Sequence, residues 1–190
     1  EMVISYLDIN DTTMAEKTLL EVKVIADKIF YENHPLISKY YISIARLNQI
    51  RNNYSISEIN FNKAIEILEY SLPWNSIERA EALLLRSKLF QEIGSDNDYI
   101  SSLRTVYGIV KNSLYGTHPL FVEVLYLIKK YYEEKSEKFL LDLFIEEEKN
   151  RLDSLIFPDF RGPFPPENAE DILKNTNVIA LSLKAIIALP

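Results

Sequence analysis

The stretch Tyr115-Gly116-Thr117-His118-Pro119-Leu120-Phe121 has a counterpart upstream, Tyr31-Glu32-Asn33-His34-Pro35-Leu36-Ile37, and this pair is the main evidence for the fold. The two His-Pro pairs begin at positions 34 and 118, an offset of twice 42. A true period of 42 predicts a third copy centred on position 76, and Trp74-Asn75-Ser76-Ile77 there supplies polar residues suited to a helix start. The sequence therefore indicates an internal repeat, and a period of this length is typical of helical solenoids.

Apolar residues fall into the same register. Stepping by 42 aligns Tyr41 with Leu83 and Leu125, Leu47 with Leu89 and Tyr131, Leu19 with Phe61 and Leu103, and Ile25 with Ile67 and Ile109. The pattern predicts helices over residues 13–31, 34–51, 56–72, 76–93, 97–114, 118–132 and 136–153. We expect His34 and His118 to cap helices whose first residue is proline, and Gly94 to take the left-handed conformation that ends a helix.

The last part of the chain departs from the repeat. Pro158, Pro163, Pro165 and Pro166 exclude a helix, and the three phenylalanines among them predict an ordered strap packed on the repeats. An apolar stretch from about Glu167 to Leu189 predicts a helix that caps the last repeat; a contact between copies of the chain or a domain junction is the alternative. We therefore divide the chain into residues 1–152, repeats that begin inside a helical hairpin and so belong to a longer chain, and residues 153–190.

Composition excludes several function classes. The chain has no cysteine, so disulfides and cysteine-ligated metals are excluded and a reducing, cytoplasmic setting is favoured. A net charge of −7 without a basic stripe argues against nucleic acid and anionic membrane as partners. No run of apolar residues reaches the length of a membrane helix.

Catalytic and cofactor motifs are also missing from the sequence. Both histidines occupy the same slot of the repeat, which fits helix capping better than proton transfer. The sequence has no glycine-rich phosphate loop and no metal-ligand spacing, so we predict no catalytic residue, no metal and no cofactor. We therefore interpret the chain as a protein that binds other proteins.

In each repeat a helix ends, a loop like Tyr-Gly-Thr-His-Pro follows, and a new helix begins. This pattern, at a period of 42 residues, resembles the tetratricopeptide repeats of kinesin light chains. The resemblance covers about residues 1–152 and implies an all-α, tetratricopeptide-like solenoid of helical hairpins, with the proline-rich strap and the C-terminal capping helix added to it. The chain is also similar to the C-terminal helical domain of SET-MYND lysine methyltransferases. That resemblance implies an alternative function, an accessory domain of such an enzyme.

The tetratricopeptide resemblance also implies where a peptide would bind. Ala45 and Ser87 fit the small-residue slot that packs against the partner helix, so the next position would face the concave groove. The residues at that position are Arg46, Lys88 and Lys130. The position three residues before the small-residue slot also tends to face the groove, and it holds Ile42, Leu84 and Tyr126. Aligned cations beside apolar groups predict a groove for a peptide that carries acidic residues and an apolar anchor. The alternative is an ordinary solvated helix face.

Overall fold

The helices of the chain follow the 42-residue period throughout the part that the structure describes. This structure is a computed structural model, which describes residues 2–113 and 118–156. Its helices are α1 (Met2–Asp8), α2 (Thr12–Ile29), α3 (Pro35–Ile50), α4 (Tyr54–Ser71), α5 (Ile77–Glu92), α6 (Asp96–Ser113), α7 (Pro119–Glu134) and α8 (Lys138–Ile156). From α2 onward, each helix and the helix two places later begin at the same slot of the repeat. The predicted repeat of paired helices is therefore confirmed, and the described residues contain no strand.

The helix starts at the predicted motif use side-chain caps. The Nδ1 atoms of His34 and His118 each accept a hydrogen bond from the backbone N–H two residues on, at 3.2 Å. Ser76 holds the same slot in the repeat between them, and its Oγ accepts from the N–H of Arg79 at 3.3 Å. Because each cap satisfies an N–H that the helix leaves unpaired, the shared role of these residues is structural.

The turn inside each hairpin also recurs. Asn10, Asn52, Gly94 and Ser136 have φ angles of 58°, 60°, 75° and 57°, and all four occupy one slot of the repeat. Left-handed backbone at Gly94 was expected from the sequence. The other three were not, because they are not glycine, although asparagine tolerates this region better than most residues.

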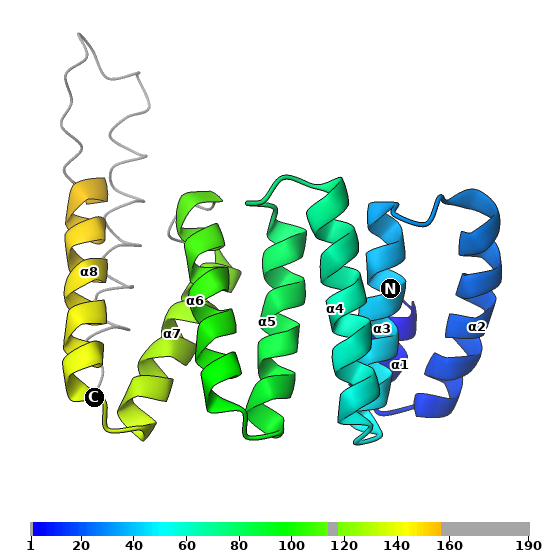
Figure 1. Ribbon diagram of the computed structural model, residues 1–190, viewed down its shortest axis with the longest axis horizontal. Coiled ribbons are helices and arrows are strands. Elements are labelled where there is room, and N and C mark those ends of the chain that lie inside the picture. Colours follow the sequence, from blue (N-terminus) through cyan, green and yellow to red (C-terminus); the bar gives the residue numbers. More distant parts are fainter. Residues whose placement is uncertain (1, 114–117, 157–190) are drawn as a thin grey trace, which may run out of the picture. The chain divides into compact units, whose positions relative to one another are not determined.

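The chain divides into two units, residues 1–113 and 114–190. In the first unit each helix packs against the next one along the chain, from α1 to α6, and α1 also contacts α3 (Figure 1). A buried cluster of Ala45, Phe61 and Leu89 joins α3, α4 and α5. In the second unit, α7 packs against α8.

Helix α2 buries only part of its apolar surface. Leu19 is buried, but Leu20, Val24, Ile25 and Ile29 are each more than half exposed. The apolar residues of α2 surround the helix, whereas its main packing partners are α1 and α3. Apolar composition therefore overstated how much of this helix is buried in the described structure.

The part predicted to hold the strap and the capping helix, residues 153–190, overlaps the end of α8, which runs to Ile156. The rest of it, residues 157–190, lies outside the described residues. None of the described helices combines the length and the apolar character needed to cross a membrane.

Candidate functional site

A hollow of about 750 Å³ lies among the first helices of successive hairpins in the first unit. Helix α1 contributes its C-terminal end, α3 contributes Arg46, Gln49 and Ile50, and α5 contributes Leu85, Lys88 and Glu92. Residues Asn10, Asn52 and Tyr54 line it from the turns and the start of α4. The structure thus brings Arg46 and Lys88, predicted to share one surface, into a single hollow.

The 42-residue register explains this arrangement. Arg46 and Lys88 occupy the same position of two repeats, so stacking of equivalent helices places them on one side of the unit. The preceding positions, Ala45 and Ser87, are both 0% exposed, as the small-residue slot requires. Adjacent helical residues differ by about 100° around the axis, so burying Ala45 turns Arg46 toward the edge of the interface.

The charges that line the hollow balance one another. The guanidinium of Arg46 forms an ion pair with Asp8 of α1 at 2.8 Å, and both side chains are partly exposed, at 26% and 58%. Lys88 and Glu92 lie one helical turn apart on α5 and line the same hollow. An ion pair as exposed as that of Arg46 and Asp8 is worth only about 0.2–1 kcal/mol, so a carboxylate from a partner can replace Asp8 at low cost.

The apolar residues of the hollow differ from those expected. Leu84 is only 4% exposed and belongs to the core, and Leu85 lines the hollow instead. Ile42 packs beside the cluster of Ala45, Phe61 and Leu89 and is not among the lining residues. The apolar part of the hollow comes from Leu7, Ile50, Leu85 and the ring of Tyr54.

The remaining predicted residues, Tyr126 and Lys130, lie on α7 in the second unit. Tyr126 is 53% exposed. The ammonium of Lys130 pairs with Glu134 at 3.6 Å, one turn further along the helix. Their part in a common groove stays a prediction.

Sequence reasoning missed the acidic members of the hollow, although the register contained a signal for them. The slot four residues after that of Arg46, Lys88 and Lys130 holds an acid in three of its four copies, Asp8, Glu92 and Glu134, and Ile50 in the other. Lys88 and Lys130 are each followed by an acid of this slot, and Arg46 pairs with Asp8 of the preceding repeat, which indicates a surface of mixed charge rather than a purely basic one.

The described residues offer little for catalysis. No group of three or more histidine, aspartate or glutamate side chains in this part of the chain could hold a metal ion. Both histidines, His34 and His118, use Nδ1 to accept a backbone N–H at a helix start. The hollow contains exposed charges, three amide side chains and apolar groups, which suit recognition of a chain segment.

Helical hairpins that repeat at this period form a tetratricopeptide-like helical repeat fold. A solved structure of kinesin light chain nearly identical TPR-like repeats from Podosopora anserina shares this fold with a TM-score of 0.65 at 16% identity, covering 98% of this chain and 90% of that one. BtubC (BKLC) from P. vanneervenii is similar with a TM-score of 0.64 at 12% identity, over 97% of this chain and 69% of that one. The expected likeness to kinesin light chain repeats is confirmed at the level of the fold.

Aspartyl phosphate phosphatase F from Bacillus subtilis is similar as well, with a TM-score of 0.60 at 15% identity over 97% of this chain and 49% of that chain. No protein-family model and no curated protein matches the sequence. Because one fold is shared by proteins with such different names, the fold assigns no chemistry by itself. The likeness to SET-MYND methyltransferases stays a prediction.

Proposed function

We propose that this protein is a non-catalytic scaffold that binds a peptide segment of a partner protein in the hollow among α1, α3 and α5. The observation that carries the proposal is the presence of Arg46 and Lys88 in one hollow of about 750 Å³ with an apolar wall beside them. Pockets of roughly 300–1,000 Å³ that combine apolar walls with a few polar groups are typical of binding sites.

The preferred segment is an extended or helical one that carries acidic residues and one aromatic or large aliphatic anchor. Its acidic residues would exchange with Asp8 on Arg46 and approach Lys88, which sets register and association rate. Its anchor would contact Leu85 and Tyr54. Affinity is modest, because each exposed charge contact is worth about 0.2–1 kcal/mol while a buried anchor is worth about 2 kcal/mol or more.

The partner class follows from the same charges. A phosphate backbone or an anionic membrane would need clustered cations, and Asp8 and Glu92 stand among the cations of the hollow. We therefore propose a protein partner rather than a nucleic acid or a membrane. The lack of cysteine supports a cytoplasmic setting, which is part of the same proposal.

Peptide-library selection on the whole chain tests the proposal. We expect enrichment of peptides that combine acidic residues with an aromatic or large aliphatic residue. A selected peptide should bind the double variant Arg46→Glu, Lys88→Glu at least about tenfold more weakly, since two attractive contacts become repulsive. Enrichment of basic peptides would count against the proposal.

The control is a variant with the same change in net charge away from the hollow. Lys17→Glu with Lys28→Glu changes two exposed residues of α2. We expect it to retain nearly all of the binding measured at physiological salt. Equal losses in the two double variants would show that net charge, not the hollow, governs binding.

A further inference from the structure

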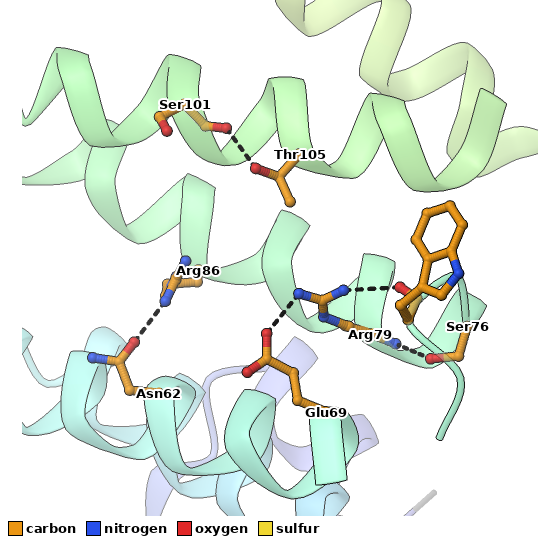
Figure 2. Close-up of polar contacts among 8 residues, drawn as sticks. Asn62, Glu69, Ser76, Arg79, Arg86, Ser101 and Thr105 are labelled. Carbon is orange, nitrogen blue, oxygen red and sulfur yellow. Dashed lines mark hydrogen bonds and ion pairs between the residues drawn. The ribbon is translucent and has the colours of Figure 1, made fainter. Parts of the chain in front are cut away.

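A second cavity, of about 470 Å³, lies on the other side of α5, between α4 and α6. Arg79 and Arg86 of α5 line it, with Asn62 and Glu69 from α4 and with Ser101, Ser102 and Thr105 from α6. Figure 2 shows the two arginines on α5 pointing toward α4, with Ser101 and Thr105 on the other side. Arg86 and Lys88 are two positions apart, about 200° around the helix, so this cavity and the hollow use opposite sides of α5.

The two arginines stand where the other repeats carry apolar residues. The equivalents of Arg79 in the repeats before and after it are Ile37 and Phe121, which are 9% and 0% exposed. The equivalents of Arg86 are Ile44, which packs against a buried cluster, and Ile128, which is 1% exposed. One repeat has therefore exchanged two residues of an apolar interface for cations, and neither helix formation nor stacking of the repeats requires that exchange.

The two arginines differ in how well the protein satisfies them. Arg79 donates to Glu69 at 2.6 Å and to the carbonyl of Trp74 at 2.8 Å, so its charge is balanced (Figure 2). Arg86 donates to the neutral amide oxygen of Asn62 at 2.7 Å, and its guanidinium lies 5.4 Å from the ring of Phe90. The buried Nε atoms of both arginines lack a hydrogen-bond acceptor among the described residues, so the difference is that Arg79 pairs with a carboxylate and Arg86 does not.

Electrostatics agree with this difference. Burial lowers the pKa of the Arg86 guanidinium, against the opposing influence of Glu58, Glu69 and Asp98, none of which pairs with it among the described residues. The other carboxylate that lines the cavity, Glu66, pairs with Lys63 at 3.2 Å. One half-buried positive charge is thus left without a carboxylate, beside a wall of hydroxyl groups.

We infer that this cavity is a binding site for a carboxylate, held by Arg86 with help from the Asn62 amide and the hydroxyls of Ser101 and Ser102. A planar carboxylate matches the edge of a guanidinium, and hydrogen bonds from a charged donor are the stronger ones. A single negative charge balances Arg86. A phosphate dianion would bring a second charge close to Glu69, so the carboxylate is favoured.

The test titrates the whole chain with N-acetylglycine at constant ionic strength, followed by nuclear magnetic resonance of backbone amides and arginine Nε–H groups. We expect saturable shifts at Arg86, Ser101 and Ser102. Arg86→Ile installs the residue that two other repeats use, so it should fold with a melting temperature no lower than that of the parent chain. It should weaken binding about tenfold or more, as expected for a lost charged hydrogen bond.

Two further variants sharpen the test. Arg86→Gln removes the charge but keeps a donor toward Asn62, and it should lose binding to the same extent. Lys17→Gln removes one exposed charge from α2 and should leave the titration unchanged. An unchanged midpoint in Arg86→Ile or Arg86→Gln, shifts that never saturate, or tighter binding of inorganic phosphate than of N-acetylglycine would each overturn the inference.

Discussion

Two glycine-to-alanine substitutions in the first unit should change stability in opposite directions. Gly94 lies in the turn between α5 and α6 with φ +75°, whereas Gly108 lies inside α6. A Cβ added at either position meets no heavy atom within 4 Å. Because neither substitution causes a steric clash, the backbone conformation alone decides the sign.

The magnitudes follow from the two conformations. A left-handed backbone costs an ordinary residue roughly 1–2 kcal/mol, so Gly94→Ala should lower the free energy of unfolding by about 1 kcal/mol or somewhat more. Alanine in a helix interior is favoured over glycine by about 0.8–1.0 kcal/mol, so Gly108→Ala should raise the free energy of unfolding by nearly as much. Gly94→Asn should cost less than Gly94→Ala, because asparagine occupies this slot at positions 10 and 52.

Urea unfolding followed by circular dichroism at 222 nm measures all three variants. We expect equal denaturant slopes and midpoints that separate in the order Gly108→Ala, parent chain, Gly94→Asn, Gly94→Ala. The corresponding shifts in melting temperature are about 2–4 °C per kcal/mol for a chain of this size. If Gly94→Ala were as stable as the parent chain, the turn between α5 and α6 would not require a residue with a left-handed backbone, and the prediction would be wrong.

Three further predictions concern a cap, the core and the hollow. Ser76→Ala should lower the free energy of unfolding by about 1 kcal/mol and Ser76→Asp by much less, because only the alanine variant loses the acceptor for the N–H of Arg79; equal urea midpoints would contradict the cap. Phe61→Ala should cost about 3–5 kcal/mol, because the ring is 0% exposed between three helices; a loss below about 1 kcal/mol in the same assay would place it outside the core. Asp8→Asn should tighten an acidic peptide up to about fivefold by releasing Arg46 from its ion pair, as measured by fluorescence anisotropy; weaker binding would show that Asp8 helps to hold the peptide.

Local chemistry explains why the helices could be predicted from the sequence. The His-Pro pairs at 34 and 118 start helices through contacts within one turn, so these residues alone were sufficient to place α3 and α7. The period then placed the remaining helices without any tertiary information. Left-handed backbone at Asn52 and Ser136 was missed because the signal used was glycine, although both positions occupy the repeat slot of Gly94.

The candidate site was predicted less completely, because it depends on rotation about the helix axis. A shift of one residue along a helix turns the side chain by about 100°. That rotation explains why Leu84 is buried in the core while Leu85 lines the hollow. The pairing of Arg46 with Asp8 joins two repeats and could not be read from either alone. The exchange of isoleucine for Arg86 was visible in the register, but only the packing of α5 between α4 and α6 shows the cavity that it lines.

A crystal structure of the whole chain with a peptide selected from the library would show directly where the peptide binds. We expect the peptide to lie in the hollow among α1, α3 and α5, with an acidic residue at Arg46 or Lys88 and its anchor against Leu85. A peptide bound elsewhere on the chain, with the ion pair of Arg46 and Asp8 unchanged and the hollow empty, would contradict it.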